Sequence, residues 1–309
     1  MAAPPLVVVF DPLPVFDYRA ERAIIEAAGA RLHVPTSGAD EAIADADVVV
    51  VTGRRRFTAD NVAALTRCVG VQTSSTGADY VHPSLGERGI PLRTAAGYCT
   101  EEVSDHAIAL LLAAWRRIPM LDAVGRTPGW EGSRTWTRPL RRLRGHTVGI
   151  VGMGRIGRAL AAKAGGLGLV VVGHDPFVDA APVPLLGLDD LLGTADAIVL
   201  CAPATDGSRH LLDARRLALT RPGVIVVNVS RGALVDEAAL LDALDRGHVA
   251  VAALDVRATE PAAEGDSLAG RADTILTPHT AGSSAEAEAQ LHETTAYGAL
   301  DLLREAGRL

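Results

Sequence analysis

In the first third of the chain, short apolar runs typical of strands alternate with segments that have the hydrophobic period of helices. Short runs of Val, Ile and Leu predict strands, which lie at residues 5–10, 31–34, 47–52, 69–74 and 90–95. Apolar residues at helical spacing predict helices between them, at residues 19–29, 39–46 and 58–68. Strands that alternate with helices form a parallel sheet covered on both faces. We therefore expect an α/β domain in this part of the chain.

A second alternating unit begins at residue 146, and its later strands are predicted at residues 197–203, 223–230, 249–256 and 274–279. The helix predicted over residues 101–118 is apolar nearly all round, which indicates burial between the two domains. Residues 125–145, rich in Gly, Pro, Trp and Arg, indicate an irregular segment that contacts another subunit. The last helix, 284–306, has no strand after it, so we expect it to return to the first domain.

Composition narrows the class of protein. The chain has 309 residues, of which 48% are hydrophobic and 22% charged, as in a globular protein of about two domains. Its net charge of −7 argues against nonspecific nucleic-acid binding. Cys68, Cys99 and Cys201 show no metal-ligand spacing, so we expect a reducing cytoplasm, no disulfide and no metal site. The longest apolar run, 107–115, is too short to span a membrane, and no signal peptide is expected at the N-terminus.

A glycine fingerprint opens the second unit. Gly152, Gly154 and Gly157 form GxGxxG directly between a predicted strand and a predicted helix. The first glycine permits a tight turn, the second lets the backbone approach a pyrophosphate, and the third lets the helix pack close to the sheet. The N-terminal N–H groups of that helix then face the anion. The sequence therefore predicts a dinucleotide-binding site.

The next predicted strand ends at Asp175, 18 residues after Gly157. An acidic residue at about this distance accepts hydrogen bonds from the hydroxyls of the adenosine ribose. Its charge repels a 2′-phosphate, and Pro176 and Phe177 supply no arginine to receive one, so NAD is predicted rather than NADP. The alternative is that Asp175 only caps the turn before Pro176.

Three strand ends of the second unit each carry one chemically active residue: Arg231, Glu260 and His279. Ligands of doubly wound sheets bind at these ends. Reduction of a 2-oxoacid needs a proton donor at the carbonyl oxygen, and a histidine has a suitable pKa. A carboxylate behind the ring favours the imidazolium, and a guanidinium matches a substrate carboxylate. Taken singly, Arg231 could be a surface residue, Glu260 a turn residue and His279 a structural histidine.

Together with the glycines, these segments resemble the D-isomer-specific 2-hydroxyacid dehydrogenases, the family of D-lactate, glycerate, formate and phosphoglycerate dehydrogenases. The resemblance covers nearly the whole chain. It implies that Arg231 binds substrate, Glu260 is the partner of the histidine and His279 is the acid/base. It also implies reduction or oxidation of a small 2-oxoacid or 2-hydroxy acid with NAD(H), by a homodimer that closes about hinges near residues 97–101 and 279–284.

The resemblance adds further residues around the cofactor. Asp255 corresponds to an acidic residue near the nicotinamide carboxamide, although it could simply cap a strand end. The loops at Ala202–Pro203 and Asn228–Val229 correspond to cofactor-lining loops, although ordinary turns are nearly as good an interpretation. Gly282 would leave space beside His279. The predicted cofactor-binding residues are Gly152, Gly154, Arg155, Ile156, Gly157, Asp175, Ala202, Pro203, Val229, Asp255, His279 and Gly282.

Residues 74–112 resemble the substrate side of the same family. Backbone N–H groups around Thr76 and Gly77 would bind the substrate carboxylate together with Arg231. The chain reads TAAG at 94–97 where many members read Asn-Thr-Pro-Gly, which puts polar contacts there in doubt. Tyr98 would line the pocket or else be a buried structural residue. Arg54 opens a run of three arginines, which is either a solvated surface or a receptor for a second anionic group of the substrate.

These observations predict two doubly wound α/β domains. A flavodoxin-like substrate domain would comprise residues 1–98 and 284–309, and a Rossmann NAD-binding domain, residues 99–283, would be inserted into it. Residues 99–118 and 142–157 look most similar to the C-terminal-binding-protein branch of the family. That similarity leaves a different function open, namely an NAD(H)-binding regulator with little turnover. Which 2-oxoacid is used does not follow from the sequence.

Overall fold

The computed structural model describes residues 3–36, 43–128 and 140–309. The chain divides into two compact units. The first comprises Met1–Cys99 and Ser284–Leu309, and the second comprises Thr100–Ser283. The chain thus passes between the units twice, after Cys99 and after Ser283.

The first unit contains a five-stranded sheet in the order β2-β1-β3-β4-β5, in which every neighbouring pair is parallel. Its strands are β1 (Leu6–Phe10), β2 (Arg31–His33), β3 (Val48–Val51), β4 (Gly70–Thr73) and β5 (Leu92–Arg93). This is the flavodoxin-like order, in which the direction of winding reverses between β1 and β3. The loops that follow these two strands therefore lie where such sheets bind ligands.

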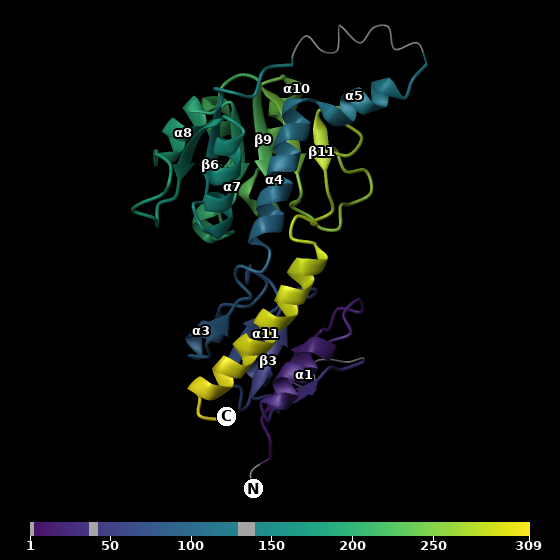
Figure 1. Ribbon diagram of the computed structural model, residues 1–309, viewed down its shortest axis with the longest axis vertical. Helices are drawn as coiled ribbons and strands as arrows, with labels where there is room; N and C mark the ends of the chain where they lie inside the picture. Colours follow the sequence, from purple (N-terminus) through teal and green to yellow (C-terminus); the bar gives the residue numbers. More distant parts are fainter. Residues whose placement is uncertain (1–2, 37–42, 129–139) are drawn as a thin grey trace. The chain divides into compact units, whose positions relative to one another are not determined.

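Helices cover both faces of this sheet, which explains why β3 is a run of four buried valines. Val48 and Val50 pack with α1 (Arg19–Ala27) and α11 (Ala285–Glu305). Val49 and Val51 pack on the opposite face with α2 (Ala59–Ala64) and α3 (Ser84–Glu87). Figure 1 shows α11 lying along β3 beside α1. The last helix of the chain therefore completes the first unit, as the sequence predicted.

The second unit contains a six-stranded parallel sheet in the order β11-β10-β9-β8-β6-β7. Its strands are β6 (Thr147–Val151), β7 (Val170–His174), β8 (Ala197–Leu200), β9 (Val224–Asn228), β10 (Val249–Leu254) and β11 (Thr274–Leu276). Beyond β7, a single parallel bridge joins Gly173 to Leu185. With this bridge as a vestigial third strand, the order is that of a Rossmann domain, which reverses between β6 and β8.

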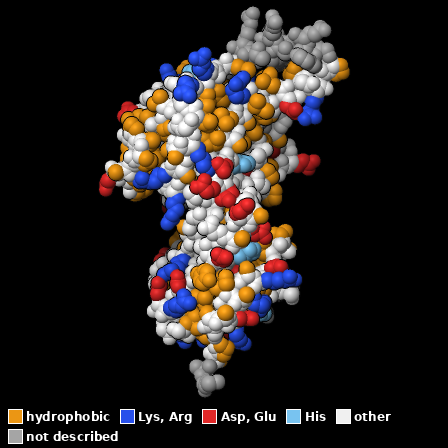
Figure 2. All heavy atoms as spheres, viewed as in Figure 1, with side chains coloured by type: hydrophobic (Ala, Val, Ile, Leu, Met, Phe, Trp, Pro, Cys, Tyr) orange, Lys and Arg blue, Asp and Glu red, His pale blue; other side chains and the backbone are white. Residues whose placement is uncertain are grey.

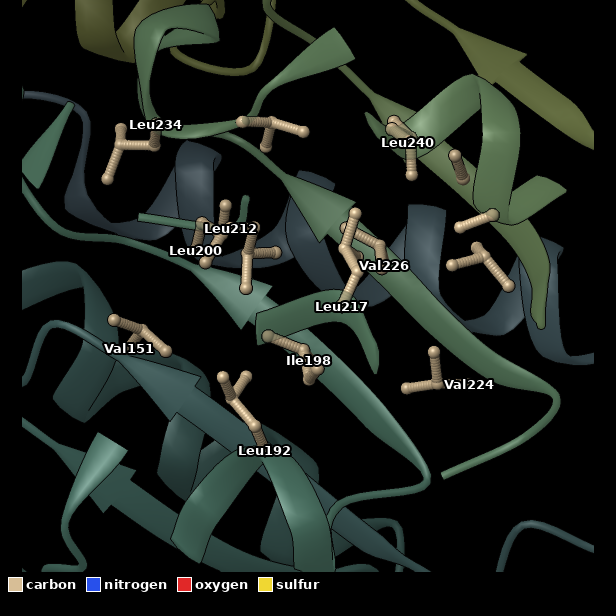
Figure 3. Packing of buried hydrophobic residues seen from close by; sticks show 14 of the residues in the cluster. Val151, Leu192, Ile198, Leu200, Leu212, Leu217, Val224, Val226, Leu234 and Leu240 are labelled. Atoms are coloured by element: carbon tan, nitrogen blue, oxygen red, sulfur yellow. The ribbon is translucent and has the colours of Figure 1, made fainter. Parts of the chain in front are cut away.

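Two helical layers sandwich this sheet. On one face, α8 (Leu188–Thr194), α9 (Ala214–Leu219) and α10 (Glu237–Asp245) enclose a cluster that includes Leu192, Leu217 and Leu240. Figure 3 shows these side chains meeting Ile198 and Val226 of the sheet. On the other face, α4 (Thr100–Trp115) packs on α7 (Arg155–Gly166), β9 and β10. The sequence predicted both doubly wound sheets.

The prediction that α4 is buried all round was wrong. One face of α4 is buried, while Glu101 and Asp105 are exposed and bind the ammonium group of Lys163 on α7, with Asp105 Oδ1 at 2.6 Å from Nζ. The prediction of one helix over 101–118 was also inexact, because a second helix, α5 (Ile118–Gly125), begins after Arg117 adopts a left-handed conformation.

Two other predictions fall partly on residues that the structure does not describe. The helix predicted over 39–46 was wrong for residues 43–46, which form a turn, and residues 39–42 lie outside the described chain. Most of the segment 125–145, predicted to contact another subunit, likewise falls in the undescribed range 129–139. Among the described residues, none of the helices combines the length and the apolar character needed to cross a bilayer.

Candidate active site

The glycine loop between β6 and α7 has the three features that a pyrophosphate site requires. Gly152 has a φ of +98°, and a Cβ there would lie 2.6 Å from the Ala202 nitrogen at the end of β8. A Cβ on Gly157 would lie 2.0 Å from the Gly152 carbonyl oxygen. Around Gly154, by contrast, a Cβ would meet nothing within 4 Å. The first and third glycines are thus needed by the fold, and the second faces open space.

The N-terminus of α7 supplies the donors for an anion. The Arg158 N–H donates to the Gly154 carbonyl at 3.0 Å, the bond that closes the first helical turn. The preceding N–H groups, of Arg155, Ile156 and Gly157, therefore have no acceptor within the helix. Arg155 is exposed and Ile156 half-buried. Donors of this kind beside an uncrowded glycine fit the phosphates of a dinucleotide.

Asp175 lies directly after β7 and is bound to the glycine loop. Its Oδ2 accepts from the Met153 N–H at 2.8 Å, and its Oδ1 accepts from the Phe177 N–H at 3.0 Å. The carboxylate therefore caps the turn, which was the alternative interpretation of this residue. Each oxygen keeps a second lone pair, so capping leaves acceptor capacity for ribose hydroxyls.

Arg158 was not singled out in the sequence, although its guanidinium reaches the same region. Its Nε donates to the Met153 carbonyl at 2.9 Å and its Nη2 to the Ala180 carbonyl at 2.7 Å. Arg158 thus joins the glycine loop to the segment after Asp175. The signal that could have found it is its place in the first turn of the fingerprint helix.

Glu260 and His279, predicted from separate strand ends, lie in contact. His279 Nδ1 is 2.6 Å from Glu260 Oε2, and the side chains are 48% and 35% exposed, so the pair is open to solutes. The other oxygen of Glu260, Oε1, accepts from the Arg257 N–H at 2.8 Å. The carboxylate is held at both ends, which fixes the orientation of the imidazole.

This contact shifts both pKa values towards the charged forms. The pKa of His279 lies above its ordinary value, chiefly because Glu260 accepts its hydrogen bond, while partial burial and the charge of Arg231 act in the opposite direction. For Glu260, partial burial raises the pKa. The hydrogen bonds from His279 and the Arg257 N–H outweigh it, and the pKa of Glu260 lies below its ordinary value.

The loop of Arg231 packs on the loop of Glu260, since a Cβ on Gly232 would lie 1.9 Å from the Arg257 carbonyl oxygen. The charge of Arg231 acts to lower the pKa of both His279 and Glu260. Asn228, the last residue of β9, holds the loop by donating from Nδ2 to the Arg231 carbonyl at 2.8 Å. The structure therefore brings together all three residues that the sequence predicted as catalytic.

Asp255, the residue after β10, is only 1% exposed, and it holds the loop that carries His279. Its Oδ1 accepts from the Thr280 N–H and its Oδ2 from the Ala281 N–H, both at 2.9 Å. Its carbonyl oxygen accepts from the His279 N–H at 2.8 Å. The cap that was the alternative interpretation is thus present, and it caps the loop that carries His279.

A second support, which the sequence did not indicate, holds the loop of Glu260. Arg257 is bound by Asp266 at 2.6 Å and by Glu237 at 3.3 Å, and Glu237 also accepts from the Ala258 N–H. A Cβ on Gly232 would lie 1.9 Å from the Arg257 carbonyl, so the loop after Arg231 packs directly on this one. The loops that carry Arg231 and Glu260 therefore support each other by direct packing.

Comparison with known proteins agrees with this geometry. Residues 108–281, more than half of the chain, match the model of the D-isomer specific 2-hydroxyacid dehydrogenase NAD-binding domain. The chain belongs to the D-isomer-specific 2-hydroxyacid dehydrogenase family.

Individual relatives point to the same family. D-3-phosphoglycerate dehydrogenase of Mycobacterium tuberculosis is 40% identical over 253 residues, which are 80% of this chain and 47% of that protein. Hydroxypyruvate reductase of Blautia hydrogenotrophica is 35% identical, covering 66% of each chain. The crystal structure of the TT0316 protein from Thermus thermophilus superimposes with a TM-score of 0.82 at 31% identity, over 97% of both chains. The chain spans about half the length of the phosphoglycerate dehydrogenases that it matches.

The remaining residues that the sequence predicted to bind the cofactor lie at strand ends of the second unit. Ala202 and Pro203 follow β8, and Val229 follows β9. Ser230 Oγ donates to the Ala202 carbonyl, which joins the two loops. Gly282, half-buried, follows the segment held by Asp255. These residues surround the same edge of the sheet as the glycine loop, because the carboxyl ends of parallel strands share one edge.

Apart from Arg231, the predicted substrate residues lie in the first unit. Thr76 is exposed, with Oγ1 at 3.7 Å from the Cys99 sulfur, and Gly77 accepts from Ser75 Oγ through its carbonyl at 2.7 Å. Tyr98 is half-buried, which is compatible with both interpretations, a pocket residue or a structural one. Arg54 lies after β3, with Nη1 at 3.3 Å from Oδ1 of the buried Asp11. The roles of these residues are predictions.

The glycine loop gives a test of cofactor binding. Gly154→Ala should fold normally, because the space around it is open, yet raise the Kd for NADH by about tenfold or more, because the methyl group occupies the approach to the phosphates. Gly157→Ala should instead unfold at lower temperature. NADH fluorescence titration and thermal denaturation measure the two effects. Gly166→Ala, also in α7 with open space around it, is the control and should change neither. Unaltered NADH binding by Gly154→Ala would contradict this site.

Proposed function

We propose that the chain is an NAD-dependent oxidoreductase that transfers a hydride between NAD(H) and a small 2-oxoacid or D-2-hydroxy acid. The observation that carries this proposal is the 2.6 Å contact between His279 and Glu260, with Arg231 on the adjoining loop, in the domain that matches the family's NAD-binding model. An acid/base and an anion receptor beside a dinucleotide loop are what such a reaction requires.

The chemistry of the site follows from its donors. Bound NADH supplies the hydride. Because Nδ1 of His279 is bound to Glu260, Nε2 is the ring atom that gives a proton to the developing alkoxide in reduction, and takes one back in oxidation. Glu260 keeps the imidazole oriented and favours its protonated form. Arg231 binds the substrate carboxylate and, with its charge, stabilises the oxyanion.

The regulatory alternative is not favoured. The relatives that the chain matches are named as dehydrogenases and reductases. The chain also keeps Glu260 and His279 in contact, and the charge of Arg231 acts on both. The similarity to the C-terminal-binding-protein branch stays a prediction.

We further propose a homodimer in the cytoplasm. On α4, Ile108 and Leu112 are half-buried and Ala109 is exposed, and Ile118 of α5 is 53% exposed. Figure 2 shows apolar side chains gathered over α4, whereas basic and acidic side chains are interspersed elsewhere on that face. Such an apolar helix face is typical of a subunit contact. The three cysteines are free, which is compatible with a reducing compartment.

Arg54 is the candidate for recognising a second anionic group of the substrate. It lies where the winding of the first sheet reverses, and its side chain is 52% exposed. Asp11 engages one of its nitrogens at 3.3 Å, which leaves other donors of the guanidinium for a phosphate or carboxylate. Arg55 also binds Asp11, so Asp11 holds two arginines at this reversal point.

The central experiment is an assay of NADH oxidation with a panel that includes glyoxylate, pyruvate, hydroxypyruvate and 3-phosphohydroxypyruvate. We expect turnover of at least one of them, and kcat/KM at least tenfold lower with NADPH, because Asp175 repels the 2′-phosphate. NADH binding without turnover of any 2-oxoacid would favour the regulatory alternative. Equal kcat/KM with NADPH and NADH would contradict the predicted preference for NAD over NADP.

The pH dependence tests the role of Glu260. Reduction needs protonated His279, so kcat/KM for reduction should fall as pH rises through the raised pKa of His279. Glu260→Gln removes the charge that raises this pKa, so the fall should begin at lower pH and activity near neutrality should drop roughly 10-fold to 100-fold. Glu264→Gln, in the same exposed segment, is the control and should keep the wild-type profile. An unshifted pH profile of kcat/KM in Glu260→Gln would contradict the role of Glu260 in raising the pKa of His279.

Substrate charge tests Arg54. Arg54→Ala should raise KM for a dianionic substrate such as 3-phosphohydroxypyruvate by about tenfold, while KM for pyruvate changes little, because only the dianion uses the extra guanidinium. Arg19→Ala removes an exposed arginine of the same unit and serves as the control. Equal effects of Arg54→Ala on both substrates would assign Arg54 to the solvated surface.

A further inference from the structure

A chain of hydrogen bonds runs from α4 to the loop of the acid/base histidine. Thr277 Oγ1 lies 2.6 Å from Asp255 Oδ1 and 3.0 Å from His106 Nε2. A carboxylate only accepts, so the Thr277 hydroxyl gives its single proton to Asp255. It follows that His106 carries a proton on Nε2 and donates it to Thr277. The direction of the chain is therefore His106 to Thr277 to Asp255.

The end of this chain determines the backbone of the catalytic loop. His279 has a φ of +55°, in the left-handed region that a residue with a side chain adopts only when its neighbours hold it there. The neighbours that hold it are the bonds to Asp255 from the N–H groups of residues 279, 280 and 281. Rotation of the Asp255 carboxylate would break two of these bonds at once.

His106 is suited to prevent that rotation. Its Nε2 is 3.5 Å from Asp255 Oδ1, in addition to its bond to Thr277, and its side chain is only 25% exposed. It stands on α4, which packs on α7, β9 and β10 and is therefore a firm support. Buried polar networks of this kind specify one arrangement only while each member is satisfied.

We propose that His106 is a positioning residue for the reaction: through Thr277 and Asp255 it holds the left-handed backbone from which the imidazole of His279 reaches Glu260. The inference rests on the proposed acid/base role of His279. In the described contacts, His106 itself touches neither Glu260 nor His279.

Two substitutions of His106 separate positioning from simple packing. His106→Leu keeps bulk and removes the donor, so kcat for 2-oxoacid reduction should fall about tenfold with little change in the KM for NADH, since misplacement of an acid/base acts on the chemical step. His106→Gln places an amide N–H near the position of Nε2 and should restore kcat to within about threefold of wild type. Asp105→Asn, on the same turn but bound to Lys163, is the control and should leave kcat unchanged.

The titration of His279 supplies a readout that does not depend on turnover. In wild type, NMR of the ring should show a midpoint above the ordinary value for histidine, because of Glu260. In His106→Leu the loosened loop should weaken that contact and move the midpoint down, and His106→Gln should move it back. Thr277→Val should act like His106→Leu, and the double variant should be no worse than either alone, because both break one chain.

The outcomes distinguish the two proposals. Wild-type protein that turns over no 2-oxoacid would overturn the proposed function, while a shifted His279 midpoint in His106→Leu would still support positioning. An active enzyme in which His106→Leu changes neither kcat nor the midpoint would overturn positioning alone. If His106→Leu and His106→Gln lost thermal stability and kcat to the same extent, His106 would have a merely structural role. That result would also overturn the positioning role.

Discussion

The loop that carries His279 depends on one buried carboxylate. Asp255 directly follows β10, and its carboxylate accepts hydrogen bonds from Thr277, Thr280 and Ala281 in the loop after β11. A carboxylate buried to this degree is costly unless hydrogen bonds satisfy it. Here the donors are the backbone N–H groups of the segment that must be held. The desolvated charge and the strained loop therefore stabilise each other, and removing either leaves the other without its partner.

The same logic of mutual support extends to the neighbouring loops. Arg257 would be an isolated charge at 10% side-chain exposure without Asp266 and Glu237, and these two carboxylates would be unpaired without it. Its backbone N–H meanwhile fixes Glu260. The imidazole is thus set by two loops that are rigid for independent reasons, so the 2.6 Å contact between them does not require movement of either. Such preorganisation is what makes an acid/base effective.

Much of this arrangement could be predicted from the sequence because parallel sheets bring strand ends to one edge. Arg231, Glu260 and His279 each follow an apolar run, and that alone places them together once the runs are recognised as neighbouring strands. The glycine spacing was equally informative, since Gly152 and Gly157 have no room for a side chain. His106 could not be found in this way. Its partner Thr277 is 171 residues away in the chain. Within α4, His106 is one polar residue in an apolar pattern, and no neighbouring residue in the sequence indicates what it binds.

Where the prediction of α4 failed, the physical reason also explains what the helix does. Apolar residues nearly all round suggested full burial, but Glu101 and Asp105 form an exposed edge of α4 that binds Lys163 of α7. His106, next to Asp105, instead contacts Thr277 and Asp255, at the ends of β11 and β10. Both places where the chain leaves the second unit, before Thr100 and after Ser283, adjoin the two segments that His106 joins. The bond between α4 and Thr277 therefore ties the entry and exit of the chain to the residues that hold the imidazole.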